Sequence, residues 1–305
     1  MITNETRKKL KRYKGVYVFL IPAVVSVLLF NYRPMMGILM AFQDFDIKLG
    51  YFGSPFVGLK HFYTFLNNPA FYRALTNTVG IGTISFVLSF PVPIVFALLL
   101  NELRWTKVKR VTQTVSYLPH FISWIVVSTM VVRLLDNDTG VVNNIMVMFG
   151  GDRIPFMRVG KYFWAIVIIA HIWKETGWNS IIYLAALSSI DQEMYEASKI
   201  DGAGRLKTLW YITLPSIAPT VALLMVLDVG MLVNAGGLFD AIYNLQNPLI
   251  AESAYTLEVY SYFEGILYKR YSYAAAITVT QSLIALTMVL LSNTVYKKAT
   301  GNSVF

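Results

Sequence analysis

Long apolar runs without charge are the feature that most limits how this chain can fold. Residues 74–101 and 271–296 contain no Asp, Glu, Lys or Arg. Each run exceeds the roughly 20 residues that an α-helix needs to cross a bilayer. Inside lipid the backbone must satisfy its own hydrogen bonds, which leaves helices and closed barrels as the only spanning structures. Runs of this length predict membrane-spanning helices.

The same pattern recurs along the chain and predicts an all-α integral membrane bundle of six transmembrane helices. Only 14% of the residues are charged and 56% are hydrophobic, whereas soluble domains are about 25% charged. The six expected spans are 16–42, 74–101, 111–132, 162–190, 216–239 and 271–296. Pro91 and Pro93 are expected to kink the second span.

The distribution of basic residues predicts that both termini are cytoplasmic. With six spans and the N-terminus inside, the cytoplasmic segments hold fifteen Lys and Arg residues and the outer loops hold eight. Cytoplasmic segments of membrane proteins carry this excess. The net charge of +9 therefore reflects membrane topology, and no nucleic-acid partner is expected. The predicted organisation is a basic tail 1–15, a first span 16–42, an outer loop 43–73, a core of five further spans over 74–296 and a C-terminal tail 297–305.

A polar segment at 188–215 interrupts the apolar pattern between the fourth and fifth spans. Ser189 followed by Gln192 fits a capping box that would start a short helix. Asp201 suits the N-cap of a second short helix, and Gly202 permits a sharp turn. Pro215 is expected to end that second helix. The segment predicts two short helices at the cytoplasmic mouth of the bundle, although an ordinary amphipathic loop is an alternative.

This segment resembles the EAA loop of binding-protein-dependent ABC importer permeases, whose pattern is EAA-x-x-DGA, eight residues and then I-x-LP. The matching residues are Glu196, Ala197, Asp201, Gly202, Ala203, Ile212, Leu214 and Pro215. Ser198 stands where the second Ala is usual, and Leu209 stands where Phe is common. A weaker likeness, Val57-Gly58-Leu59-Lys60-His61-Phe62, resembles the VGL-x-NF sequence before the second span of sugar-type permeases.

The resemblance implies a maltose-type importer subunit that takes up an oligosaccharide into the bacterial cytoplasm across the cell membrane. It implies a second homologous permease subunit, two ATPase subunits beneath the bundle and an extracytoplasmic solute-binding protein. The loop residues, including Leu209, would couple the chain to the ATPases. ATP and Mg²⁺ would bind the ATPase subunits and no cofactor would bind this chain. An acidic, uronate-containing sugar is left open, because membrane topology accounts for most of the basic residues.

Motifs for catalysis are missing from the sequence. There is no G-x-x-x-x-G-K-[ST], no H-E-x-x-H and no G-x-S-x-G, and cysteine is absent. These patterns hold phosphates, zinc and an activated serine in proteins that use them. We therefore expect that this chain is not an enzyme and holds no metal.

Polar and aromatic residues inside the spans are the candidates for a solute path. Sugars need aromatic faces for stacking and amide or hydroxyl partners for their hydroxyl groups. The candidate residues are Trp173, Lys174, Glu175, Trp178, Asn179, Asp228, Asn234, Tyr243 and Asn244. For Lys174 and Glu175, a structural ion pair and a wall of the path are equally compatible with the sequence. His120 is expected to be packed and hydrogen-bonded, and His61 to be a solvated loop residue.

Two other functions use the same residues. An ion-coupled secondary transporter acting alone would use Asp228, Lys174 and Glu175, and would be expected to show inverted repeats. The spans show no such repeats. A membrane scaffold or receptor would need no solute path at all.

Overall fold

The computed structural model describes residues 13–301, and its regular structure is helical apart from one antiparallel bridge between Gln43 and Phe56. The chain divides into two compact units. The first unit joins the residues up to Asn67 with 264–279, and the second contains 68–263 and the residues from 280 on. Of the predicted basic tail, residues 1–12 lie outside the described residues.

The first unit contains the first predicted span and residues 43–67 of the predicted outer loop. Its elements are α2 (Lys14–Val27), the π-helical turn η1 (Leu28–Tyr32), the 3-10 helix η2 (Arg33–Phe42), α3 (Gly50–Gly53), α4 (Lys60–Leu66) and the first turns of α17 (Tyr271–Thr300). The π-helical turn η8 (Phe263–Leu267) leads into it. The side chains from Tyr17 to Val27 of α2 are exposed, as expected for a helix whose surroundings are lipid.

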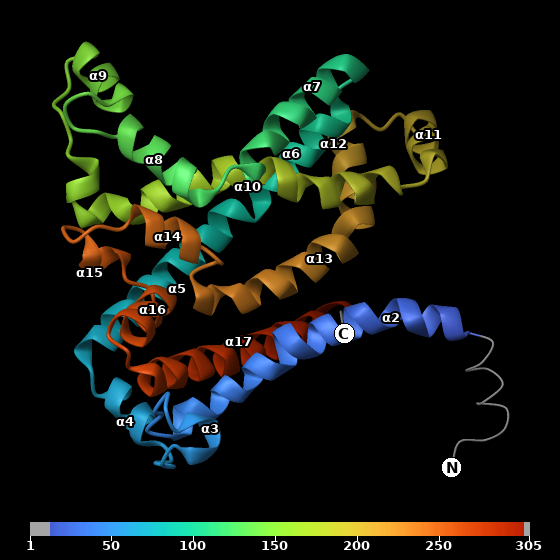
Figure 1. Cartoon of the computed structure of the whole chain (residues 1–305). Helices are drawn as coiled ribbons and strands as arrows, with labels where there is room; N and C mark the ends of the chain where they lie inside the picture. Colours follow the sequence, from blue (N-terminus) through green and yellow to red (C-terminus); the bar gives the residue numbers. More distant parts are fainter. Residues whose placement is uncertain (1–12, 302–305) are drawn as a thin grey trace. The chain divides into compact units, whose positions relative to one another are not determined.

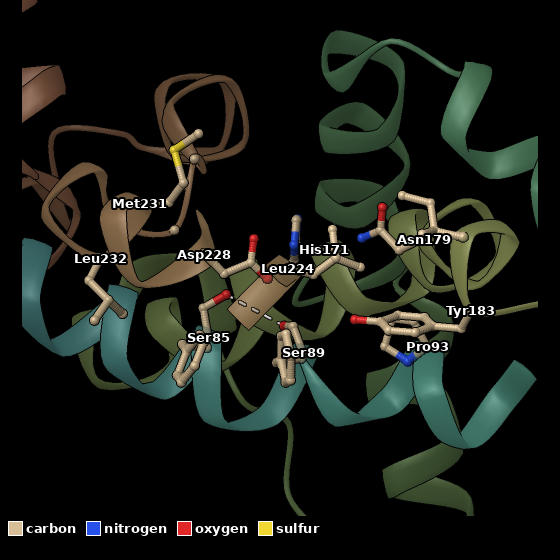
Figure 2. A pocket seen from close by; sticks show the side chains of 15 residues that line it. Ser85, Ser89, Pro93, His171, Asn179, Tyr183, Leu224, Asp228, Met231 and Leu232 are labelled. Carbon is tan, nitrogen blue, oxygen red and sulfur yellow. Dashed lines mark hydrogen bonds between the residues drawn. The ribbon is translucent and has the colours of Figure 1, made fainter. Parts of the chain in front are cut away.

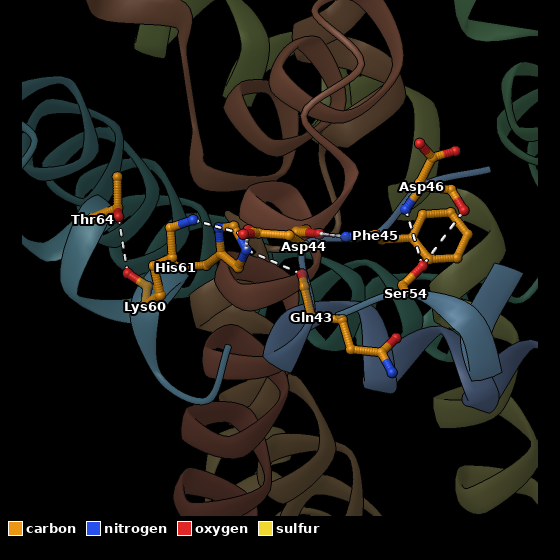
Figure 3. A network of polar contacts seen from close by, with 9 residues as sticks. Gln43, Asp44, Phe45, Asp46, Ser54, Lys60, His61 and Thr64 are labelled. Carbon is orange, nitrogen blue, oxygen red and sulfur yellow. Dashed lines mark hydrogen bonds and ion pairs between the residues drawn. The ribbon is translucent and has the colours of Figure 1, made fainter. Parts of the chain in front are cut away.

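A polar network fixes the outer loop of the first unit (Figure 3). Lys60 Nζ donates to Asp44 Oδ2 at 2.7 Å, and His61 Nε2 lies 3.0 Å from Asp44 Oδ1 and 3.1 Å from the Gln43 carbonyl oxygen. The hydrogen bond from Lys60 holds the pKa of Asp44 below its ordinary value. The His61 side chain is only 14% exposed. The expectation of a solvated His61 is therefore wrong, because its ring nitrogen bridges the carboxylate and a backbone carbonyl.

The second unit contains the remaining elements. They are α5 (Pro69–Ser89), α6 (Pro91–Glu102), α7 (Thr106–Tyr117), η3 (Leu118–Phe121), α8 (Trp124–Leu134), α9 (Val141–Met148), η4 (Phe156–Arg158), η5 (Gly160–Tyr162), α10 (Phe163–Ser188), α11 (Gln192–Ile200), α12 (Arg205–Thr208), η6 (Leu209–Thr213), α13 (Leu214–Met231), η7 (Leu232–Asn234), α14 (Phe239–Leu245), α15 (Ala251–Ala254), α16 (Leu257–Tyr262) and the later turns of α17.

Helix α10 is the centre of this unit (Figure 1). It packs along α6 and also contacts α5, α7 and α13. Near its start, Phe163 and Val167 join a core with residues of α14, α15 and α16. Near its end, Tyr183 and Leu187 pack against α6 and α13, and the chain then continues into α11. One helix thus connects the two ends of the unit.

Four described helices are long and apolar enough to cross a membrane: Tyr17–Phe42, Pro69–Glu102, Arg205–Leu245 and Tyr271–Lys298. The count becomes five if the bent pair Thr106–Phe121 and Trp124–Leu134 is one span. These correspond to five of the six predicted spans. The remaining one, predicted over 162–190, is the single helix α10, which a buried ion pair, a histidine and three tryptophans make more polar.

The third predicted span is not straight. Its two helices meet at an angle of 100°. Pro119 cannot donate a backbone hydrogen bond, and Ile122 and Ser123 are extended, with ψ near 131° and 150°. The helix therefore stops after Phe121 and restarts at Trp124. In the second span, by contrast, the α-helix is interrupted only at Phe90, directly before Pro91.

Candidate functional site

A cavity of about 300 Å³ lies among the helices of the second unit (Figure 2). Its lining comes from α5, α6, α10, α13 and the turn after α13. The lining residues are Ser85, Phe86, Ser89, Phe90, Pro93, His171, Asn179, Ile182, Tyr183, Leu224, Asp228, Met231, Leu232, Gly236 and Gly237. Apolar walls with a few convergent polar groups are typical of ligand sites.

Four polar side chains of this cavity have no hydrogen-bond partner within the described part of the chain. They are His171, Asn179 and Tyr183 on α10 and Asp228 on α13. Ser85 and Ser89 on α5 contact each other, with their hydroxyl oxygens 3.5 Å apart. Polar groups inside a membrane bundle are costly unless they meet protein, water or a solute. Unsatisfied groups converging on one space indicate a site that binds a polar solute.

An unwound turn closes one side of the cavity. Ala235, Gly236 and Gly237 follow η7 with φ of 48°, 73° and 74°. Ala235 is fully buried, and a left-handed conformation costs a non-glycine residue of order 1–3 kcal/mol. Gly82 on α5 faces the Leu232 carbonyl so closely that a Cβ there would collide with it. Irregular backbone at membrane depth is tolerated where it lines a cavity, and this turn places Gly236 and Gly237 on the wall.

Lys174 and Glu175 form an ion pair and are not among the residues that line the cavity. Lys174 Nζ donates to Glu175 Oε1 at 2.9 Å and to the His120 carbonyl oxygen at 2.7 Å. Glu175 Oε2 lies 2.6 Å from His120 Nδ1, and the His120 ring stacks on Trp178 with centroids 4.3 Å apart. The prediction of a packed, hydrogen-bonded His120 is confirmed. This cluster joins α10 to the break between α7 and α8.

The predicted path residues therefore fall into separate groups. Asn179 and Asp228 line the cavity. Trp173 and Trp178 lie on α10 with about half and two-fifths of their surfaces exposed, and Trp178 contacts the His120 cluster. Asn234 belongs to the turn after α13, where its carbonyl accepts from the Gly237 N–H at 2.8 Å. Tyr243 and Asn244 lie on α14, where Tyr243 stacks with Phe239.

Sequence reasoning missed most of the cavity. Ser85, Ser89, His171 and Tyr183 were not among the candidates, although they line it. The available signal was spacing: His171, Asn179 and Ile182 recur at helical intervals on one face of α10, and Ser85 and Ser89 are one turn apart on α5. Their residue types alone are common in membrane helices.

The segment 188–215, called the coupling loop here after its predicted role, differs locally from the expected caps. Asp191 is the N-cap of α11, since its Oδ1 accepts from the Glu193 N–H at 3.0 Å. Ser189 instead donates to the Ala186 carbonyl at 2.8 Å, so the capping box predicted at Ser189 is wrong. Asp201 is the C-cap of α11 and not the N-cap of α12, a position that Gly204 takes.

Gly202 makes the turn that was expected of it. Its φ is +69°, which favours glycine because it has no Cβ. Its N–H donates to the Lys199 carbonyl at 3.1 Å, and the Ala203 N–H donates to the Ser198 carbonyl at 2.9 Å. These two bonds form a Schellman motif that ends α11.

A second helical run begins after this turn. It extends from Arg205 through Asn234, with the π-helical turn η6 inside it. Pro215 lies in the first turn of α13. The expectation that Pro215 ends a helix is wrong, because a proline in a first turn loses no needed hydrogen bond and the π-helical turn provides the adjustment.

Hydroxyl contacts hold α11 against the following helix. Ser198 Oγ lies 3.4 Å from Thr208 Oγ1, and the Tyr195 hydroxyl lies 3.2 Å from Thr213 Oγ1. The serine that replaces the usual alanine thus gains a contact within the loop. A groove of about 410 Å³ between the two helices is lined by Met194, Ala197, Ser198, Asp201, Ala203, Lys207, Thr208, Tyr211 and Ile212.

The loop also exposes large apolar side chains. Ile200 is 87% exposed, Leu206 73% and Trp210 66%. Glu196 is exposed beside them. Of the other residues that fit the EAA pattern, Leu214 is partly buried and Pro215 is exposed. Leu209, which stands where Phe is common, is partly buried. Large exposed apolar and aromatic side chains on a fixed helix pair suit a protein interface.

Residues 70–298 match the family of binding-protein-dependent transport system inner membrane components, and the chain belongs to this family. It is therefore a multi-pass inner-membrane permease component of an ABC importer. The match includes both the cavity and the coupling loop.

Several similar proteins are named as components of carbohydrate transporters. The chain is 41% identical over 290 residues to the polygalacturonan/rhamnogalacturonan transport system permease protein YteP of Bacillus subtilis, covering 95% of this chain and 90% of that protein. It is similar, with a TM-score of 0.89 and 37% identity, to a chain of a bacterial ABC transporter involved in the import of the acidic polysaccharide alginate, covering 97% of this chain and all of that one. A second structure of a bacterial alginate transporter, in complex with an alginate pentasaccharide-bound periplasmic protein, gives a TM-score of 0.88 at 37% identity.

Proposed function

We propose that this chain is the membrane subunit that passes a uronate-containing oligosaccharide from a solute-binding protein into the cytoplasm. The cavity lined by the polar side chains of Ser85, His171, Asn179 and Asp228 is the observation that carries this proposal. Hydroxyl, amide and imidazole groups match the hydroxyl groups of a sugar. The acidic class is supported by the two relatives whose names specify polygalacturonan and alginate.

The proposed topology has six spans with both termini in the cytoplasm. Length and apolarity alone do not identify helix α10 as a span. It is the sixth span of this topology, because Lys174 and Glu175 neutralise each other within the protein. This arrangement places the coupling loop in the cytoplasm. Residues 43–73 and the segments that contain α9 and α14–α16 then face outward.

The proposed assembly contains a second homologous permease subunit, two ATPase subunits that bind ATP and Mg²⁺, and the solute-binding protein. The groove and exposed side chains of the coupling loop would contact one ATPase subunit. Closure of the ATPase pair would then favour one of two states of the bundle, because a partner shifts an equilibrium by its differential affinity. Glu196 and Ile200 would face the ATPase, while Gly202 keeps the two helices at their angle.

The test is ATP hydrolysis in proteoliposomes that contain this chain with its ATPase and permease partners. We expect hydrolysis to rise when a solute-binding protein loaded with oligogalacturonate or oligoalginate is added. The unloaded binding protein and one loaded with a neutral oligosaccharide are the controls. Uptake driven by an ion gradient, by this chain alone and without ATP, would contradict the proposal and support the secondary transporter. In the described structure Lys174 and Glu175 are paired with each other and do not line the cavity.

A further inference from the structure

The cavity wall that this chain provides is anionic. Among the described residues that line it, Asp228 is the one with a carboxylate, and no Lys or Arg lines it. The nearby cation of Lys174 is bound to Glu175 and to the His120 carbonyl, with 6% of its side chain exposed. The remaining polar lining residues are hydroxyl, amide and imidazole groups.

Asp228 differs from three other carboxylates of the described chain, because each of those three has an ion-pair partner. Glu175 contacts Lys174 and His120, Asp44 contacts Lys60 and His61, and Glu264 contacts Arg270. Asp228 has no hydrogen-bond or ion-pair partner within the described residues, and its side chain is exposed to the cavity. An ionised carboxylate only accepts hydrogen bonds, and it accepts them from hydroxyl donors more strongly than a neutral group does.

We propose that Asp228 is a specificity-determining residue that binds sugar hydroxyl groups and keeps sugar carboxylates away from the α13 wall. Like charges repel strongly where little water separates them. A uronate unit beside α13 would therefore turn its hydroxyl edge toward Asp228 and its carboxylate toward the part of the path that this chain does not form. The inference rests on the proposed function, since it concerns how the same cavity receives an oligosaccharide.

The test compares two sugars of equal length in proteoliposomes of the complete transporter. One is trigalacturonate and the other is the same trisaccharide with its carboxyl groups reduced to alcohols. Uptake is measured for the wild type and for Asp228→Asn, and the ratio of acidic to neutral kcat/KM is calculated for each. Because the same binding protein delivers both sugars to both variants, its own preference cancels when the two ratios are compared.

We expect Asp228→Asn to raise the ratio of acidic to neutral uptake about threefold or more, because only the acidic sugar loses a repulsion. Asp228→Glu retains the charge and should keep the wild-type ratio. Asp152→Asn removes the same charge from an exposed position outside the cavity and should also keep it. If Asp228→Asn does not insert, Asp228→Ser carries the same expectation.

An unchanged ratio in Asp228→Asn, or an equal change in Asp228→Glu, would overturn the inference. If the proposed function itself is wrong, a different result is expected: the loaded binding protein does not stimulate ATP hydrolysis by the wild-type complex.

Discussion

The coupling loop and the cavity belong to the same compact unit but are built in opposite ways. The loop gathers its functional residues into one stretch of 28 positions, and most of them are exposed. The cavity draws one to four residues from each of several helices between Ser85 and Gly237. A contiguous surface makes a motif that can be read in the sequence, whereas a dispersed surface appears only after the helices are packed. The two regions should also fail separately when they are altered.

The largest expected effect is loss of the folded protein, which abolishes the coupling loop and the cavity together. A Cβ at Gly177 on α10 would collide with the Ser116 carbonyl of α7, so Gly177→Val cannot be accommodated without moving the helices apart. The backbone carbonyl cannot change rotamer to make room, so the cost exceeds the usual overpacking cost of about 1–3 kcal/mol, and we expect loss of folded protein in the membrane. Ala185→Val, at an exposed position of the same helix, is the control. Normal folded yield of Gly177→Val, measured by size-exclusion profile in detergent, would contradict the close crossing.

The next effect concerns the ion pair between Lys174 and Glu175. Glu175→Leu leaves the Lys174 cation buried without its partner, and loss of one member of a buried pair costs about 3–5 kcal/mol. We expect a clear fall in the melting temperature of the purified complex. The double variant Lys174→Met with Glu175→Leu should recover most of it, because neither charge remains. A double variant as unstable as the single one would show that the pair is not what holds α10 to the break after α7.

A substitution that disturbs the backbone turn of the coupling loop should lower transport without preventing folding. Gly202 requires φ of +69°, which a β-branched residue adopts poorly. Gly202→Val should lower binding-protein-dependent uptake by about tenfold and ATP hydrolysis by less, so that less sugar is taken up per ATP hydrolysed, with normal membrane insertion.

Two matched variants separate this cause from side-chain volume. Gly202→Asn should retain most activity, because Asn tolerates the left-handed region. Gly204→Ala should do so as well, since Gly204 has φ of −72° and open space around it. Equal loss in all three variants would assign the effect to contact with the ATPase and not to the turn.

The smallest expected effect is a pH dependence of stability outside the spans. Burial, and next the nearby Asp240, raise the pKa of Glu258 on α16 to about 7, and its Oε2 is buried without a hydrogen-bond partner. The folded chain therefore binds this proton more tightly than the unfolded chain does, so stability falls as pH rises from about 4.5 to 7. We expect a loss of about 1–2 kcal/mol over this window.

Glu258→Gln should remove that part of the pH dependence. Melting temperatures of the purified complex between pH 5 and 8 check this, with the wild type falling more steeply than the variant. Parallel curves for the two proteins would contradict the assignment.

Sequence reasoning worked where one residue property determines the structure. Charge-free length predicted the spans over 74–101 and 271–296, and the left-handed turn at Gly202 follows from glycine chemistry. It failed where neighbours compete. Asp191 displaced Ser189 as a cap, and Pro119 with the His120 cluster bent the third span. Ser85 and His171 were missed because the face of a membrane helix that points inward depends on packing against other helices.

The most direct test of the account measures uptake and ATP hydrolysis in the same proteoliposomes for Gly202→Val and Asp228→Asn. The coupling loop should set the amount of sugar taken up per ATP hydrolysed, and the cavity should set the preference between acidic and neutral sugars. We predict that Gly202→Val changes the first quantity and keeps the second, while Asp228→Asn does the reverse. A loop variant that alters sugar preference, or a cavity variant that alters only uptake per ATP, would contradict the assignment of these two roles.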